Sequence, residues 1–236
     1  MKSSIASAIR SIASICDRAV ISIDSTDAQN TKDAAQRACI DCNLPVTFLE
    51  HIWENSFSKM RNGVIEHIEA AGNADWLIWI DGHEYLCPGH QHILKSLIET
   101  CSADIWLWSF IIKMMDHDGH WRDSFMQAKM WRIGKGIKYT AREMHNQIDL
   151  DAVAQEHRAG HADIWVMHER TIENANARKV QRDELLPATL IPKIAEGDED
   201  ALFHMLAHWY SCREYEKFFE LYETVRWRET ALMPDC

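Results

Sequence analysis

The residues most capable of chemistry follow a short apolar segment, in the stretch Asp75-Trp-Leu-Ile-Trp-Ile-Asp81-Gly-His83-Glu84. Asp81 and His83 are two positions apart, so in an extended turn their carboxylate and imidazole can reach one divalent ion. Mixed oxygen and nitrogen ligation suits Mn²⁺ or a similar ion better than Ca²⁺. Ligand sites in open α/β sheets lie just beyond the carboxyl ends of strands. The stretch therefore predicts a metal site, although the triplet alone is more typical of a polar surface turn.

The elements that must position these residues alternate between strands and helices. Short apolar strands are expected at 19–23, 46–49 and 76–80, with helices at 1–16, 33–42, 58–71 and 90–101. This alternation is typical of a parallel α/β sheet with crossover helices. Longer strands follow at 105–114 and 125–133, joined through 116–120, and a last short strand at 163–167. From residue 171 onward the pattern is helical, which predicts a catalytic domain at 1–170 and a helical extension at 171–236.

Composition narrows the class of protein. The chain has 236 residues, 47% of them hydrophobic, and a formal net charge of −11. An acidic total argues against a protein held to DNA mainly by its overall field. The seven cysteines show no framework spacing, and Cys39-x-x-Cys42 favours helix packing over metal or redox work. No apolar run approaches the ~20 residues that cross a bilayer. We expect a cytoplasmic protein without membrane insertion.

Several segments, in order along residues 1–170, carry a family resemblance. They are Val20-Ile-Ser-Ile-Asp24-Ser-Thr26-Asp27, Trp53-Glu-Asn-Ser-Phe57-Ser-Lys-Met-Arg61-Asn62, Asp75-Trp76 through Asp81-Gly-His83-Glu84, and the later Met130-Trp-Arg132, Tyr139 and Met144-His145-Asn-Gln147. Together they resemble the family-2 glycosyltransferases of GT-A fold. The most similar branch is the bacterial and phage one, which carries tetratricopeptide-like helices at its C-terminus.

This resemblance implies a fold and a reaction. The fold would be a GT-A, Rossmann-like mixed sheet flanked by helices, with a small all-helical extension. The reaction would move a sugar from a nucleotide-diphosphate donor, UDP-linked by default, to an acceptor hydroxyl, with inversion and with Mn²⁺ or Mg²⁺. Site roles are implied residue by residue: Asp24, Thr26 and Asp27 near the nucleoside, Arg61 and Asn62 toward the diphosphate, and Asp81 and His83 on the metal.

The remaining roles stay open among several residues. His145 is the candidate for a third metal ligand, with His168 as its rival. An inverting transfer also needs a carboxylate that accepts the proton of the acceptor. Glu143, Asp123 and Asp116 are the candidates for that base. Glu84 matches the family's trailing glutamate, so it is a further catalytic candidate or a support for the metal loop.

This sequence departs from the family pattern in three places. His83 replaces an aspartate, a change that preserves metal binding. Asn146 replaces a glutamate in the His-Glu-Gln element, which puts a base role there in doubt. The family's first strand has no counterpart before the first helix. Either the sheet is rearranged, or the true start lies upstream, or a neighbouring copy in a homo-oligomer supplies that strand.

The acceptor and two rival functions also stay open. A saccharide, a protein and a hydroxymethylated DNA base are all conceivable acceptors. A DNA acceptor would need a basic surface, for which the candidates are Arg122, Lys129, Arg132, Lys135, Lys138 and Arg142. The rival functions are a non-catalytic binding module on a degenerate GT-A domain, and a hydrolase of nucleotide sugars.

Overall fold

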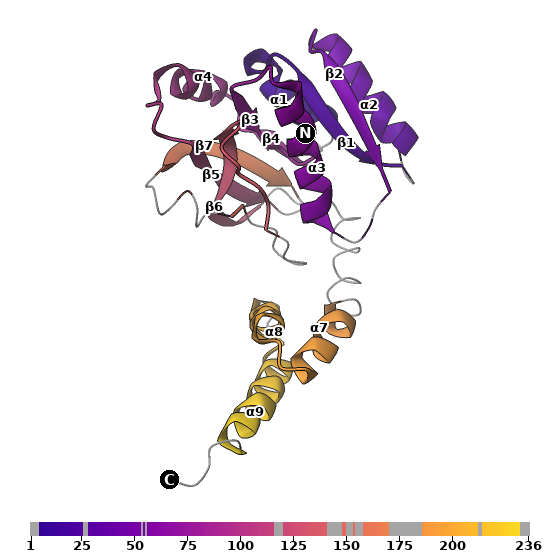
Figure 1. Ribbon diagram of the computed structural model, residues 1–236, viewed down its shortest axis with the longest axis vertical. Helices are drawn as coiled ribbons and strands as arrows, with labels where there is room; N and C mark the ends of the chain where they lie inside the picture. The colour runs from indigo at the N-terminus through magenta and orange to yellow at the C-terminus, as the bar shows by residue number, and fades with distance from the viewer. Residues whose placement is uncertain are drawn as a thin grey trace. The chain divides into compact units, whose positions relative to one another are not determined.

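The structure is a computed structural model that describes residues 5–25, 28–52, 54, 56–115, 120–140, 148–149, 153, 158–169, 186–211 and 214–231. The chain divides into two compact units, Met1–Thr171 and Ile172–Cys236. Figure 1 shows the elements of both. Those of the first unit are α1 (Ile5–Ile12), the 3₁₀ turn η1 (Ala13–Ile15), β1 (Ala19–Asp24), α2 (Ala28–Asp41), β2 (Val46–His51), α3 (Phe57–Ala71), β3 (Trp76–Ile78), β4 (Glu84–Leu86), α4 (Gln91–Thr100), β5 (Leu107–Met115), β6 (Trp121–Arg132) and β7 (Ala159–Glu169).

The strands of the first unit form two sheets. β1 and β2 pair in parallel as a two-stranded sheet, and the other five strands follow the order β3-β6-β5-β7-β4. In the larger sheet β5 and β7 are parallel, whereas the β3–β6, β5–β6 and β4–β7 pairs are antiparallel. The expected mixed α/β architecture with flanking helices is therefore confirmed. The described strands do not form a single sheet with mainly parallel crossovers, because β5 pairs with β6, and β3 with β6, in antiparallel register.

Three apolar clusters hold these layers together. One lies between α2 and the β1–β2 pair, and it includes Ile9 of α1, Ile21 and Ala38. A second packs α3 against the larger sheet, and the third packs η1 and α4 against β5 and β7. Burial of these apolar side chains is the main favourable term in the folding of the unit.

Helix α1 packs against both sheets. Its Ile9 belongs to the cluster under β1 and β2, whereas Ile12 packs against the cluster of β5 and β7. The Ser11 hydroxyl accepts a hydrogen bond from the backbone N–H of Leu86 in β4, at 3.0 Å. Figure 1 shows α1 between α2 and the strands of the larger sheet. This one helix therefore connects the two sheets.

Helix α3 has defined ends that fix the positions of its side chains. The Ser56 hydroxyl caps the start by accepting from the backbone N–H of Lys59 at 3.2 Å. The helix ends at Gly72, whose φ of 61° lies in the left-handed region that favours glycine. Val64 and Ile65 are buried, and Ile65 packs in one cluster with Leu107 and Trp131 of the larger sheet. The same helix presents Arg61 and Asn62 near its start.

The second unit consists of helices in the residues that the structure describes. They are α7 (Leu186–Ala195), α8 (Glu199–Ser211) and α9 (Tyr215–Ala231). Leu186, Leu190 and Ile194 on α7 are buried, as are Ala201 and Met205 on α8. Tyr210 of α8 contacts Tyr215 and Phe218 of α9, each at 5.9 Å between ring centroids. Among the described helices of the chain, none is long and apolar enough to cross a membrane.

Candidate functional site

Asp81 lies beyond the carboxyl end of β3 and is held by several groups. Its Oδ1 accepts a hydrogen bond from the Trp79 indole Nε1 at 2.8 Å. Arg61 Nη2 lies 3.2 Å from Oδ1 and 3.3 Å from Oδ2. The Asp81 backbone N–H donates to Glu84 Oε2 at 3.0 Å, and the Glu84 N–H donates to the Asp81 carbonyl at 2.8 Å. The turn from Asp81 to Glu84 is thus fixed by its own hydrogen bonds.

Glu84 forms a buried ion pair with Lys129. Only 2% of Glu84 and 1% of Lys129 is exposed, and Lys129 Nζ lies 2.6 Å from Glu84 Oε2. The other carboxylate oxygen of Glu84 lies 3.7 Å from Nδ1 of His168 in β7. Burial of charged groups is tolerated only when they are paired and hydrogen-bonded. Glu84 therefore connects the loop after β3 with β6 and β7.

Two imidazoles meet beside this pair. The rings of His83 and His168 are 4.4 Å apart between centroids and nearly perpendicular, at 80°. The antiparallel register of β4 and β7 places Glu84 opposite His168, which explains how residues far apart in sequence come together. The structure thus puts the rival third ligand, His168, next to His83.

The charges of the site favour ionised carboxylates. Burial alone would raise the pKa of Asp81, but the Lys129 ammonium and the Arg61 guanidinium outweigh it, together with the Trp79 hydrogen bond, and hold the pKa below its ordinary value. Burial also acts to raise the pKa of Glu84, and Lys129 and His168 overcome this effect, so that its pKa is lowered. A permanently ionised Asp81 at a strand end is suited to bind a cation.

Arg61 lies among aromatic rings as well as beside Asp81. Its guanidinium carbon is 4.9 Å from the ring centroid of Tyr139, 5.5 Å from that of Trp79 and 5.8 Å from that of Phe57. Cations are attracted to the faces of such rings. Burial raises the pKa of Tyr139, so its hydroxyl stays protonated. Arg61 is therefore a fixed positive charge within hydrogen-bond reach of the candidate metal ligand.

Asn62 uses its amide to connect α3 to the segment after β6. Its Nδ2 donates to the Tyr139 carbonyl at 3.0 Å, and its Oδ1 accepts from the Tyr139 N–H at 2.8 Å. Replacing Asn62 by Ala should lower the free energy of unfolding by about 1–3 kcal/mol, because both backbone groups of Tyr139 lose their partner. Chemical denaturation measures this loss. An unchanged stability accompanied by weakened nucleotide binding would instead favour a direct role of Asn62 on the donor.

Of the candidates for nucleoside binding, the structure describes Asp24, which lies on the smaller sheet. Asp24 ends β1, and in the register of the pair it aligns with His51 at the end of β2. Arg18, just before β1, donates to the Asn73 carbonyl just before β3, so the segments that enter these two strands lie side by side. Five other candidates lie outside the described residues: Thr26, Asp27, Asp116, Glu143 and His145.

Asp123 is the candidate base that the structure describes together with Glu84. Strand pairing aligns Glu84 with His168, His168 with Met114, and Met114 with Asp123. Partners across neighbouring strands point to the same face, with strands about 4.8 Å apart. Asp123 is exposed and lies two strands from His168, or roughly 10 Å along this row. The row thus runs from a buried carboxylate to an exposed one.

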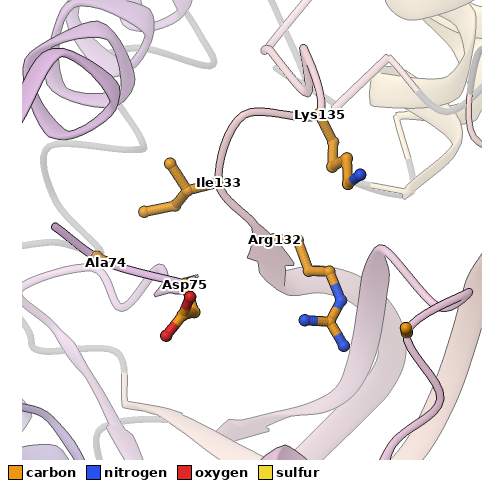
Figure 2. A pocket seen from close by; sticks show the side chains of 6 residues that line it. Ala74, Asp75, Arg132, Ile133 and Lys135 are labelled. Carbon is orange, nitrogen blue, oxygen red and sulfur yellow. The ribbon is translucent and has the colours of Figure 1, made fainter. Parts of the chain in front are cut away.

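A shallow cavity of about 290 Å³ lies at the other end of β3 from Asp81, and it is lined by Ala74, Asp75, Ala103, Arg132, Ile133 and Lys135. Figure 2 shows Asp75, Arg132 and Lys135 around it. Arg132 stacks on Trp76 at 4.2 Å, and Lys135 lies 4.9 Å from the Trp106 ring. None of the described residues predicted for metal, donor or proton transfer lines this cavity, whereas Arg132 and Lys135 belong to the predicted basic surface.

The predicted basic surface is not formed as one patch. Lys129 is buried in the pair with Glu84, so its assignment to that surface is wrong. Arg122 and Arg132 lie toward opposite ends of β6, ten residues or about 33 Å apart along the strand. Lys138 is paired with Glu66 at 2.9 Å, and Arg142 lies outside the described residues. Arg122 and Arg132 are separated because β6 is one long extended strand, whereas Arg132 and Lys135 both line the cavity at the end of β3.

Sequence reasoning missed two residues of the cluster, Trp79 and Lys129. Trp79 appeared as one apolar residue of the strand, although its position two before Asp81 lets the indole reach the carboxylate. Lys129 interrupts the otherwise apolar run Ala128–Trp131, and a lone charge inside such a strand is the signal of a buried pair.

The donor atoms of the cluster are of the types that bind Mn²⁺. Asp81 and His83, with His168 beside them, offer a carboxylate and imidazoles, and a nucleotide diphosphate would add phosphate oxygens. Among the described residues, however, no group of three or more His, Cys, Asp or Glu is arranged to hold a metal ion. The chemistry of these ligand atoms fits a metal site with two protein ligands that is completed by a substrate. In this structure the Asp81 carboxylate is paired with Arg61.

Comparison of the chain with models of protein families and with characterised proteins found no match to either.

Proposed function

We propose that this protein is a metal-dependent glycosyltransferase of GT-A type that takes its sugar from a nucleotide-diphosphate donor. A UDP-sugar is the default donor, and the acceptor is a hydroxyl group. The observation that carries the proposal is the cluster after β3, where an ionised Asp81 meets Arg61 and lies in one turn with His83. A departing diphosphate needs positive charge beside it, which Arg61 and a cation held by Asp81 and His83 would supply.

Each residue of the cluster then has a chemical task. Asp81 and His83 would hold the divalent ion, with His168 as the adjacent third candidate and His145 as its rival. When bound, such an ion acts as a Lewis acid that offsets negative charge on the leaving diphosphate. Arg61 adds a guanidinium, which pairs well with phosphate oxygens. Asp24 is proposed to contact the nucleoside.

The carboxylates divide into a positioning group and a candidate base. Glu84 is buried, bonded to Lys129 and to the Asp81 backbone, so it is suited to hold the metal loop. Asp123 is exposed and faces the same side of the sheet, which suits it to accept a proton from an acceptor hydroxyl. Asp123→Asn should therefore remove transfer while leaving donor binding intact.

The acceptor is proposed to be a saccharide or a protein. The separation of the basic residues along β6 removes the main support for a DNA acceptor. DNA binding would decrease steeply with salt because counterions are released. A mobility-shift titration between 50 and 200 mM salt therefore checks whether any affinity for hydroxymethylated DNA exists.

The proposal is tested by thermal unfolding with and without Mn²⁺, against UDP, GDP, CMP and dTDP. A ligand at 100 times its dissociation constant adds about 2.7 kcal/mol of stability, which gives a clear shift in melting temperature. A Mn²⁺-dependent shift with one nucleotide supports the proposal, and the absence of any shift contradicts it. Release of free sugar without an added acceptor would identify a hydrolase instead.

The binding-module alternative has one observation of its own. The sheet that carries Asp24 has only two strands and is separate from the sheet that carries Asp81. A nucleotide site that needs both sheets would be weakened by this separation. In a module, Asp81→Ala would leave partner binding unchanged, whereas in a transferase it removes donor binding.

A further inference from the structure

We propose that the Arg61 guanidinium occupies the place on the Asp81 carboxylate where a divalent cation would bind. A bound diphosphate attracts the guanidinium away from Asp81, so that metal and nucleotide bind with positive coupling. This inference rests on the proposed function. It assigns to the ion pair a regulatory task beyond phosphate binding: metal enters poorly until the donor arrives.

The contacts of Asp81 show what the guanidinium blocks. Arg61 Nη2 is bonded to both carboxylate oxygens, and Trp79 Nε1 also uses Oδ1. The Arg61 side chain is 14% exposed and that of Asp81 is 25% exposed. A divalent ion needs the same oxygen lone pairs. Because like charges a few ångströms apart repel, the ion and the guanidinium cannot both bind favourably to this carboxylate without an anion between them.

The surroundings of Arg61 allow the guanidinium to move. Its Nε is buried and has no hydrogen-bond partner among the described residues, which destabilises the conformation in which Arg61 is paired with Asp81. The rings of Phe57, Trp79 and Tyr139 hold the positive charge through their faces rather than through directional bonds. Of the hydrogen bonds that Arg61 makes with described residues, a turn of its side chain toward a diphosphate therefore breaks only those with Asp81, and the turn can satisfy Nε.

The exchange has a thermodynamic consequence. If the diphosphate takes Arg61 and frees Asp81, UDP must raise the affinity for Mn²⁺, and Mn²⁺ must raise the affinity for UDP by the same factor. Typical coupling between two sites is about 5–150-fold. Without the Arg61 charge, Asp81 is open from the start. Mn²⁺ alone should then bind more tightly, and the coupling should fall to the part that direct contact between metal and phosphate supplies.

The experiment is a Mn²⁺ titration followed by electron paramagnetic resonance, with and without UDP, corrected for Mn²⁺–UDP complexes in solution. It compares the wild type with Arg61→Gln and Arg61→Met, the second of which keeps a long apolar stem among the aromatic rings. Lys59→Gln is the matched control, because it removes an exposed positive charge from the same helix, where Lys59 pairs with Glu54. Melting temperatures verify that each variant is folded.

The expected result is at least about 5-fold coupling in the wild type and in Lys59→Gln. In both Arg61 variants Mn²⁺ alone should bind more tightly, and the coupling should be smaller than in the wild type. Weaker Mn²⁺ binding in the Arg61 variants, or coupling in those variants as large as in the wild type, overturns the inference and leaves the proposed function standing. Equal Mn²⁺ affinity with and without UDP in the wild type contradicts both, because UDP binding would then not depend on Mn²⁺. No binding of Mn²⁺ or UDP by the wild type overturns both.

Discussion

Replacing Asp81 by Asn is expected to abolish Mn²⁺-dependent nucleotide binding and with it any sugar transfer. Loss of an outer-shell partner of a metal ligand already costs about 10–100-fold in metal affinity, so loss of the ligand's charge should cost at least about 100-fold. The substitution keeps the size of the side chain, and Asn can still accept from the Trp79 indole, which bonds the carboxylate at 2.8 Å in the wild type. A fold-wide effect is therefore not expected.

The measurement for this variant is the Mn²⁺-dependent shift in melting temperature with the nucleotide that stabilises the wild type. Asp75→Asn is the matched control, because Asp75 precedes the same strand at its other end and lines the distal cavity. The control should retain the whole shift. If the Asp81 variant shows the same Mn²⁺-dependent shift as the wild type, the metal is held by other residues.

Replacing Lys129 by Met is expected to be the most destabilising single change in the first unit. Removing one partner of a buried ion pair costs about 3–5 kcal/mol, because the other charge stays buried without compensation. For a unit of this size, 1 kcal/mol corresponds to about 2–4 °C in melting temperature. The variant should thus melt roughly 6–20 °C below the wild type, as measured by circular dichroism.

Two further variants separate the buried charge from the lost packing. The double variant Lys129→Met with Glu84→Gln should recover part of the loss, since no uncompensated charge remains. Lys138→Met breaks the exposed pair with Glu66 and should cost no more than about 1 kcal/mol. Equal losses in the single and double variants would mean that the ion pair itself contributes little.

The same pair predicts how stability depends on pH. The folded-state pKa of Glu84 lies below its ordinary value of 4.5. Its contribution is therefore present above pH 4.5 and is lost as the pH falls from there through the folded-state pKa. The wild type should lose stability in acid, and the Lys129→Met variant should lose less over the same interval.

Local features of this chain could be predicted from the sequence. An apolar run ending in Asp81 indicated a strand end, and Ser56 and Gly72 have the residue types that begin and end a helix. These features depend on residues within a few positions of each other. For the same reason the mixed α/β class could be derived from the alternation of strands and helices.

Long-range partners could not be predicted in the same way. His168 lies beside His83 and Glu84 only because β7 pairs with β4 in one particular register. Periodicity shows which face a strand side chain takes, but not which strand lies next to it. Lysine is seldom buried, so the sequence favours a surface position for Lys129, and its partner Glu84 is 45 residues away.

The bridging position of α1 means that the first unit need not open as one piece. β1, β2 and α2 have their own apolar cluster, and hydrogen bonds of the larger sheet do not extend into it. Cooperative subunits of folding often follow such divisions. Amide hydrogen exchange should therefore be faster in β1 and β2 than in β5. Ile5 of α1 lies close to Gly82, so an opening of the smaller sheet that displaces α1 would also loosen the Asp81 turn.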